Sequence, residues 1–424
     1  MTSGIGIAKL RPRSSFMKRV KTIADVDLSG KNVLVRVDFN VPMEEGKVSD
    51  NSRICAAIPT IQQLLKQSAK VILMSHLGRP DGKKNLKYSL RPVAKELSRL
   101  IHRPVLFLDD CLGNNVSKTI EELEDGAVIM LENLRFYGEE ELNDINFAKK
   151  LASYGDAYVN DAFGTAHRAH ASTVGVPSFL PIKVAGLLVQ KELDFLGSKI
   201  ANAQRPFTVI LGGAKVSDKI GVINSLLDKC DNMIIGGAMA YTFLRAMGKS
   251  VGNSRVELDK IPDAQEALKK AQLKNIKILL PVDHMATDQL DIGGRKIGET
   301  KIVGEQIPEG YCGIDIGQKT IGIFQWAIEK AKTIFWNGPM GIFEMEKCAE
   351  GTYALAKFVA QSSAISIVGG GDSITAIHRS GNGDKITFMS TGGGASLEFL
   401  EGKELPGISI LSTLVAKHSK DAYQ

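Results

Sequence analysis

Short, continuously apolar runs rich in β-branched residues recur along the whole chain and constrain its fold most. They cover residues 33–37, 71–74, 105–108, 128–131 and 157–159 in the first half, and 208–211, 233–235, 276–280, 333–336, 365–368 and 386–389 in the second. Because apolar residues occupy consecutive rather than alternate positions, both faces of each predicted strand are buried, which is typical of parallel strands covered by helices. Helical patterns follow the runs. We therefore predict an α/β fold with two such layers in tandem.

The segment between the two sets of strands, 184–203, is predicted to be a linking helix. Its apolar residues recur with helical periodicity and are interspersed with charges, and Arg205-Pro206 ends the pattern. We expect a first domain over 21–185, the linking helix over 186–203 and a second domain over 204–405.

The composition is that of an ordinary soluble globular protein, with 424 residues, 44% of them hydrophobic, and a mean hydropathy of −0.02. No apolar run approaches the roughly 20 residues that span a bilayer, so a membrane protein is not expected. The five cysteines form no C-x-x-C pair, which argues against a disulfide framework or a zinc ribbon. A reducing compartment, most simply the cytoplasm, is predicted.

The net charge of +6 arises before Asp25, where the chain has six basic residues and no acid. The rest of the chain is balanced, and aromatic residues make up only 6%, so nucleic acid is not an expected partner. Residues 1–20 are predicted to form a disordered basic extension. Organellar targeting by this extension stays open, although it lacks the continuous apolar segment of a secretory signal.

Polar and cationic residues follow the predicted strands of the first half. They are Asp38, Asn40, His76, Arg79, Arg135, Asn160 and Asp161, with Arg53, His167, Arg168 and His170 in nearby loops. Ligands of an open parallel sheet sit at the carboxyl ends of its strands. A small, multiply charged anion needs several convergent donors of this kind. The first half is therefore predicted to bind such an anion.

Glycine clusters follow the strands of the second half. They lie at 212–213, 236–237, 337–339, 369–373 and 392–396. The last two precede helical patterns, so their backbone amides are predicted to point from helix N-termini toward a phosphate. Five such clusters at successive strand ends predict a nucleotide site.

Three charged residues accompany the glycines. Lys215 and Lys219 have an i, i+4 spacing that predicts one helix face, from which both could reach the phosphates. Asp372 could orient a Mg²⁺ ion bound to the phosphates, since this cation accepts one or two carboxylates and keeps several waters.

Other nucleotide-dependent classes fit poorly. The only Gly-Lys-Ser, at 248–250, has Phe243 where a P-loop needs glycine, and no D-F-G occurs. No G-x-G-x-x-G follows the first strand, which argues against a nicotinamide dehydrogenase. A dehydrogenase is nevertheless the runner-up among enzymes. His167 and His170 could bind a metal by their spacing, but no further ligands accompany them.

Seven segments together resemble the phosphoglycerate kinase family. They are 36–42 (RVDFNVP), 75–82 (SHLGRPDG), 131–136 (LENLRF), 160–170 (NDAFGTAHRAH), 211–219, 336–339 (WNGP) and 391–396 (TGGGAS). The resemblance runs from about residue 23 to the C-terminus. It implies two Rossmann-like three-layer domains with parallel sheets, joined by a long interdomain helix and separated by a cleft, with residues 406–424 packing back on the first domain.

The activity that the resemblance implies is reversible phosphoryl transfer between 1,3-bisphosphoglycerate and ADP, giving 3-phosphoglycerate and ATP. Transfer would be direct and in line, with domain closure by hinge bending, in a Mg²⁺-dependent monomer. The alternative is a catalytically silent nucleotide-binding scaffold of the same fold. Such a scaffold would be expected to have lost Arg53, Lys215 or Asp372, and all three are present.

The resemblance also assigns residues to the two substrates. Phosphoglycerate would be bound by Asp38, Phe39, Asn40, Arg53, His76, Arg79, Arg135 and Arg168. The nucleotide would be bound by Gly213, Ala214, Lys215, Lys219, Gly237, Gly317, Asn337, Glu344, Gly370, Gly371, Asp372 and Ser373, with Asp372 as the metal ligand. Arg53, Lys215, Gly371 and Gly394 would act on the transferring group. Ala238 and Ser373 depart from the common pattern, where many relatives have glycine and threonine.

Overall fold

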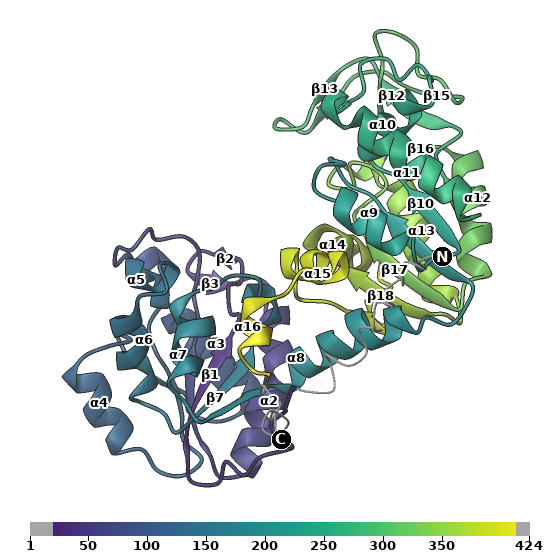
Figure 1. The fold of residues 1–424 in the computed structure, drawn as a ribbon. Coiled ribbons are helices and arrows are strands. Elements are labelled where there is room, and N and C mark those ends of the chain that lie inside the picture. Colours follow the sequence, from purple (N-terminus) through teal and green to yellow (C-terminus); the bar gives the residue numbers. More distant parts are fainter. Residues whose placement is uncertain (1–19, 413–424) are drawn as a thin grey trace, which may run out of the picture. The chain divides into compact units, whose positions relative to one another are not determined.

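The computed structural model describes residues 20–412 of the chain (Figure 1). Among these residues it forms two compact units, unit 1 with residues 20–193 and 405–412, and unit 2 with residues 194–404. Almost all of the predicted basic extension, 1–20, and the last part of the returning segment, 413–424, lie outside the described residues.

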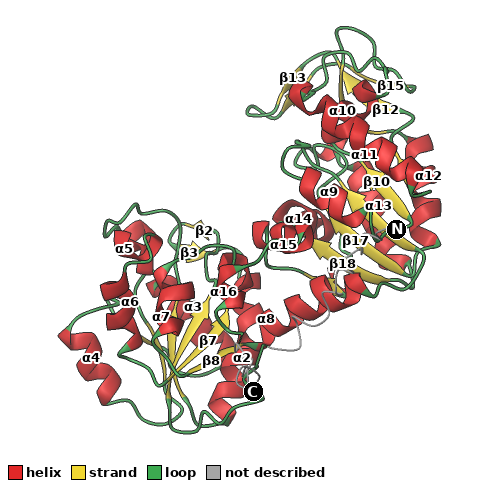
Figure 2. Ribbon diagram, viewed as in Figure 1, coloured by secondary structure: helices red, strands yellow, loops and turns green. Residues whose placement is uncertain are grey.

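Unit 1 is built on one six-stranded parallel sheet (Figure 2). Its order is β5 (Leu106–Phe107), β6 (Val128–Met130), β4 (Lys70–Met74), β1 (Asn32–Val37), β7 (Ala157–Asp161) and β8 (Ile182–Ala185). Its helices are α2 (Ser52–Lys66), α3 (Arg91–Ile101), α4 (Asn114–Glu121), α5 (Gly138–Glu141), α6 (Ile145–Ala152), α7 (Val176–Ser178), α8 (Leu187–Glu192) and α16 (Pro406–Ser409). The strands at the centre are buried on both faces, which confirms the prediction from the continuous apolar runs.

The chain returns to unit 1 after unit 2. The amide of Gly407 in α16 donates to the carbonyl of Ala166 at 2.9 Å, and the Asn160 side chain donates to the Gly407 carbonyl at 2.9 Å. In Figure 1, α16 is yellow and lies among the purple and teal elements of unit 1. The return therefore packs against the loop that follows β7.

Unit 2 contains a second six-stranded parallel sheet. Its order is β11 (Lys277–Leu279), β10 (Asn232–Ile235), β9 (Phe207–Leu211), β17 (Thr333–Asn337), β18 (Ile365–Gly369) and β19 (Phe388–Met389). Its helices are α9 (Ile220–Leu226), α10 (Met239–Ala246), α11 (Ile261–Leu273), α12 (Gln318–Glu329), α13 (Glu350–Gln361), α14 (Gly371–Arg379) and α15 (Gly394–Glu401). Helices α12 and α13 pack together, and α9 packs on α11 and α15, so two helical layers enclose the sheet. All eleven apolar runs are thus strands of the two parallel sheets.

A smaller antiparallel sheet of unit 2 was not predicted from the sequence, and the linking helix was predicted to start too early. The small sheet has the order β15 (Thr300–Val303), β12 (His284–Thr287) and β16 (Cys312–Ile316). β15 is mostly exposed and therefore has no continuous apolar run. The linking helix begins at Leu187, because the apolar residues before it form the edge strand β8. It continues as a π-helical turn, Leu193–Lys199, within which the boundary between the two units falls.

Among residues 20–412, none of the helices has both the length and the apolar character needed to cross a bilayer.

A buried histidine of the small sheet should make unit 2 sensitive to acid. Burial lowers the pKa of His284 to about 4, and the charge of Asp283 only partly opposes this shift. The unfolded chain takes up a proton near the usual pKa of about 6.5, so stability is lost as pH falls from there toward 4. His284→Phe removes this linkage, and its stability relative to the wild type should improve by about 2 kcal/mol between about pH 7 and pH 5. Urea unfolding at both pH values measures the difference, and an equal change in both proteins would contradict it.

Candidate functional site

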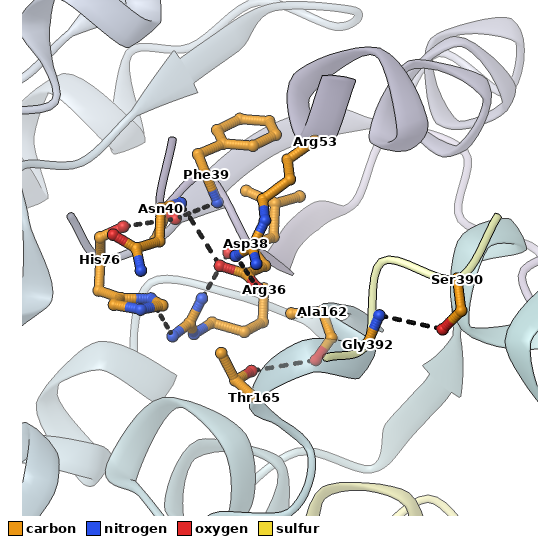
Figure 3. A network of polar contacts seen from close by, with 12 residues as sticks. Arg36, Asp38, Phe39, Asn40, Arg53, His76, Ala162, Thr165, Ser390 and Gly392 are labelled. Carbon is orange, nitrogen blue, oxygen red and sulfur yellow. Dashed lines mark hydrogen bonds and ion pairs between the residues drawn. The ribbon is translucent and has the colours of Figure 1, made fainter. Parts of the chain in front are cut away.

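The carboxyl ends of β1 and β4 are tied together by hydrogen bonds from the residues that follow them (Figure 3). The amide of Phe39 donates to Ser75 Oγ at 2.9 Å. The side-chain oxygen of Asn40 accepts from the amide of Gly78 at 2.8 Å. The predicted site residues Phe39, Asn40 and His76 therefore lie at one edge of the sheet of unit 1.

Arg53 joins this edge from the first turn of α2. Its Nη1 lies 2.7 Å from Oδ2 of Asp38, and its side chain keeps 37% of its surface exposed (Figure 3). The ion pair holds a partly exposed guanidinium at the strand end, where a ligand could compete with Asp38 for its hydrogen bonds. The structure thus brings Arg53 to the other predicted residues, although it lies fifteen positions after Asp38 in the chain.

Arg135 lies in the turn after β6 and is buried. It donates to the carbonyl of Gly78 at 3.0 Å and forms an ion pair of 3.2 Å with Glu141. Burial lowers the pKa of Arg135, and Arg36 and Arg168 act in the same direction. A buried guanidinium among other cations is stabilised by an anionic ligand.

Two histidines lie among the arginines. Burial, Arg36, Arg135, Arg53 and His170 hold the pKa of His76 well below its usual value. Burial, Arg135, Arg36, Arg168 and His167 lower the pKa of His170 to about 4. These shifts favour the neutral imidazole at physiological pH, and a neutral ring acts as a hydrogen-bonding group.

The two remaining cations of the predicted set are more accessible. Arg168 is half-buried and its Nε donates to Nε2 of the neighbouring His167 at 3.3 Å. Arg79 is exposed in the loop after β4. The strand ends of unit 1 thus form a cationic surface suited to a multiply charged anion.

Arg36 has no role predicted from the sequence, yet the structure places it in the middle of this cluster. Arg36 lies in β1 and has no exposed surface. A charged residue within a continuous apolar run was the signal available in the sequence.

In unit 2, the glycine turns after three neighbouring strands touch one another through their backbones. A side chain at Gly237 would come within 2.5 Å of the amide nitrogen of Gly213, and one at Gly338 within 2.2 Å of the Gly212 carbonyl oxygen. Both positions also have positive φ, of 64° and 101°. Glycine is required for this close approach. Because no side chains project from these positions, a ligand can reach the backbone of the turns.

Lys219 differs from the prediction, because it lies in a turn before α9 and not on a helix face with Lys215. Its ammonium donates to the carbonyls of Gly212 at 2.6 Å and Asn337 at 2.9 Å. Burial lowers its pKa to about 8, while the charge of Asp372 opposes that shift. The i, i+4 spacing of Lys215 and Lys219 does not put both side chains on one helix face, because α9 begins only at Ile220. In this structure Lys219 supports the glycine turns from within.

Lys215 is exposed in the same turn, next to the exposed Ala214. The carboxylate of Glu257 anchors the turn by accepting from the amides of Val216 and Ser217, at 2.5 and 3.1 Å, and from the Ser217 hydroxyl at 2.6 Å. Burial would raise the pKa of Glu257, but these hydrogen bonds and the charge of Lys215 lower it below its usual value. The anchor leaves the ammonium of Lys215 free to approach a ligand.

The N-termini of α14 and α15 confirm the prediction that helices follow the last two glycine clusters. Gly370, with a φ of 89°, caps the N-terminus of α14, and the next residues, Gly371 and Asp372, are exposed. At Gly394, which starts α15, a side chain would meet no atom within 4 Å. Amides at both ends are therefore accessible to an anion.

Asn337 and Ser373 connect the turns to α14. The Ser373 hydroxyl accepts from the amide of Gly338 at 2.6 Å. The side-chain amide nitrogen of Asn337 is buried without a hydrogen-bond partner in the described part of the chain. A buried donor left unpaired is costly, so Asn337 is suited to bind a ligand oxygen beside Gly370.

Gly317 and Glu344 lie on a neighbouring part of unit 2. Gly317 precedes α12 and packs closely against Asp283. Glu344 is exposed and lines a cavity of about 720 Å³, together with the hairpin β13 (Leu290–Asp291) and β14 (Lys296–Ile297). The loop that carries Glu344 runs along β16, since the amide of Ile342 donates to the Ile314 carbonyl at 3.1 Å.

The acidic side chains of unit 2 suit a Mg²⁺ ion whose ligands are mainly phosphate oxygens. Within 20–412 no cluster of three or more histidine, cysteine or acidic side chains could hold a metal by itself. Asp372 offers a single exposed carboxylate beside the open helix N-terminus. One carboxylate, phosphate oxygens and water form a typical ligand set for Mg²⁺.

Comparison with known proteins agrees with this geometry. A sequence model of the family "Phosphoglycerate kinase" matches residues 23–403. Phosphoglycerate kinase from Clostridium kluyveri is 56% identical over 394 residues, which cover 92% of this chain and 98% of that protein. The corresponding protein of Clostridium botulinum is 53% identical over 395 residues with the same coverage.

Solved structures show the same relationship. The phosphoglycerate kinase of Coxiella burnetii superimposes with a TM-score of 0.82 at 40% identity, covering 92% of this chain and 98% of the other. That of Pyrococcus horikoshii gives a TM-score of 0.80 at 35% identity with the same coverage. Sequence, fold and strand-end chemistry agree, and the chain belongs to the phosphoglycerate kinase family.

Proposed function

We propose that this chain is a glycolytic phosphotransferase that transfers a phosphoryl group reversibly between 1,3-bisphosphoglycerate and ADP, giving 3-phosphoglycerate and ATP. The observation that carries the proposal is the unequal chemistry of the two units. Unit 1 gathers guanidinium and imidazole groups at its strand ends, and unit 2 gathers glycine turns and open helix N-termini. The first suits a small polyanion and the second suits the phosphates of a nucleotide.

Phosphoglycerate is assigned to unit 1 and the nucleotide to unit 2. On unit 1, Arg79, Arg135, Arg168 and His76 would bind the anionic groups, with Asp38, Phe39 and Asn40 contributing polar contacts. On unit 2, the amides of 370–373, Asn337, Lys215 and Lys219 would hold the phosphates. The turns at Gly213, Ala214 and Gly237, with Gly317 and Glu344, would accommodate the rest of the nucleotide.

The reaction requires no general base. The nucleophile in the direction of ADP formation is the carboxylate of 3-phosphoglycerate, which is ionised at neutral pH. Catalysis then consists of positioning and of neutralising charge on the transferring group. Arg53 and Lys215 would supply positive charge, and the amides of Gly371 and Gly394 would donate hydrogen bonds.

Asp372 is proposed to hold Mg²⁺, which would neutralise phosphate charge. Asp372→Asn keeps the size of the side chain but removes its charge. The Mg²⁺ concentration that gives half-maximal activity should rise by roughly tenfold or more, because carboxylates supply the charge in such sites. Titration of activity with Mg²⁺ at fixed ATP measures this, with Asp384→Asn in the exposed turn Gly383–Lys385 as control. An unchanged Mg²⁺ dependence would remove Asp372 from the metal site.

Each unit is proposed to bind its own substrate, so that transfer follows only when both ligands drive closure of the two units. A ligand shifts such an equilibrium only through its preference for one state. Small-angle scattering should show the radius of gyration falling most with both ligands, and ATP alone should be hydrolysed negligibly. Full compaction with ADP alone would contradict this division.

The decisive experiment is a coupled assay of the purified protein with 3-phosphoglycerate, ATP and Mg²⁺. Turnover supports the kinase, and its absence with retained ATP binding would support the silent scaffold. Thermal protection by NAD in place of ADP would support a dehydrogenase. We further propose a cytoplasmic monomer, which sedimentation and cell fractionation can test.

A further inference from the structure

A chain of four buried polar side chains lies beneath the strand ends of unit 1. Glu140, in α5, accepts from the amide and the hydroxyl of Ser172 at 2.9 and 2.6 Å. The Ser172 hydroxyl accepts from Arg36 Nε at 2.7 Å. Arg36 Nη2 lies 3.2 Å from Nδ1 of His76 (Figure 3). We call this the Glu140–His76 chain.

The donor in each hydrogen bond of this chain is determined by chemistry. A guanidinium has donors only, so Nδ1 of His76 must accept from Arg36. A neutral imidazole that accepts at Nδ1 carries its proton on Nε2. The Ser172 hydroxyl accepts from Arg36 and donates its own proton to Glu140. The chain therefore selects one tautomer of His76.

The surrounding charges keep the imidazole neutral. The groups that act on His76 are Arg36, Arg135, Arg53 and His170, and all of them lower its pKa, as burial does. Glu140 is the buried carboxylate that faces these cations. Burial raises its pKa, and Arg36, the hydrogen bonds from Ser172 and Arg135 oppose that rise. The cluster thus compensates part of its positive charge through Glu140 and not through His76.

We propose that Arg36 is a positioning residue that, held by Ser172 and Glu140, keeps His76 as the neutral Nε2–H tautomer. His76 then presents one N–H donor to the anionic substrate. Without the Arg36 donor, the ring could turn or take the other tautomer and present a lone pair, which repels an anion. Arg36 and Glu140 have no exposed surface and His76 is 4% exposed, so Arg36 acts on the ligand through His76. This inference rests on the proposed function, in which His76 binds phosphoglycerate.

The first test uses the wild-type protein labelled with ¹⁵N-histidine. Two-bond ¹⁵N–¹H spectra distinguish the two tautomers and the imidazolium, and His76→Gln identifies the signal. We expect the Nε2–H tautomer throughout about pH 5.5 to pH 8. The Nδ1–H tautomer, or titration near the usual pKa of about 6.5, would overturn the proposal. This readout is independent of turnover, so it can fail while the kinase assay succeeds, and the reverse.

The second test uses Arg36→Lys, which keeps the charge but loses the planar donor pair. The spectrum should show mixed tautomers, and KM for 3-phosphoglycerate should rise about tenfold to a hundredfold, with a smaller change in kcat and an unchanged KM for ATP. Ser172→Ala, which removes the link but neither charge, should change KM in the same direction and serves if Arg36→Lys does not fold. The exposed Arg103→Lys is the matched control. Mixed tautomers with a wild-type KM would contradict the role of the chain in binding.

Discussion

Replacing Arg53 by alanine is expected to lower kcat roughly 10³-fold or more, as loss of an arginine that stabilises the transferring phosphoryl group does elsewhere. Arg53 is poised for this role because its guanidinium is partly exposed and paired with Asp38 at 2.7 Å. Charge on the phosphoryl oxygens changes most in the transition state, so binding of each substrate alone should weaken far less. Steady-state kinetics and separate binding titrations of 3-phosphoglycerate and ATP measure the two effects.

Two further variants make the Arg53 prediction specific. Arg53→Lys retains a charge but not the planar fork, so it should recover only part of the lost kcat. Arg91→Ala removes an exposed arginine of the same unit, which pairs with Asp109 and lies over the ring of Phe107, and should leave kcat unchanged. A variant Arg53→Ala with normal kcat and a raised KM would reduce Arg53 to ground-state binding.

Lys215→Met is expected to lower kcat about 10²- to 10³-fold, a loss typical of a removed group that stabilises transition-state charge. Glu257 anchors the turn next to Lys215 through Val216 and Ser217, so the ammonium is exposed while its backbone is held. Folding should be preserved because the Lys215 side chain is exposed. Steady-state kinetics and thermal melting measure both properties.

The control for Lys215 is an exposed lysine of the same unit away from the glycine turns. Lys269, in α11, meets this requirement, and Lys269→Met should leave kcat unchanged. Lys219→Met is a useful contrast, because the loss of a buried donor to Gly212 and Asn337 should lower the melting temperature as well as activity. If Lys215→Met lost only stability, Lys215 would be a structural residue.

The positions of the strands and of the glycine clusters could be predicted from the sequence because both leave local patterns. A strand buried on both faces needs consecutive apolar residues, as in β9 and β17. A turn whose backbone touches another backbone needs glycine, as at Gly237. Such requirements act on single residues or short runs, so they appear directly in the sequence.

Interactions between distant residues could not be predicted in this way. Lys219 has a helical spacing from Lys215, yet its ammonium is buried by the carbonyl of Asn337, 118 positions away. The sequence pattern places residues 184–185, the end of the edge strand β8, in the linking helix, because an apolar run next to an amphipathic helix fits either structure. The order of strands within each sheet also has no local pattern.

What the sequence by itself determined was the α/β class, the location of the parallel strands and the contrast between cationic and glycine-rich strand ends. The tertiary structure alone decided which of these groups meet and in which state. Arg36 and Ser172 are separated by 136 positions, and their hydrogen bond, with Glu140 behind it, sets the donor that His76 can offer. A tautomer depends on the partner of each ring nitrogen and on the burial that excludes water. Both exist only after the sheet and its loops have come together.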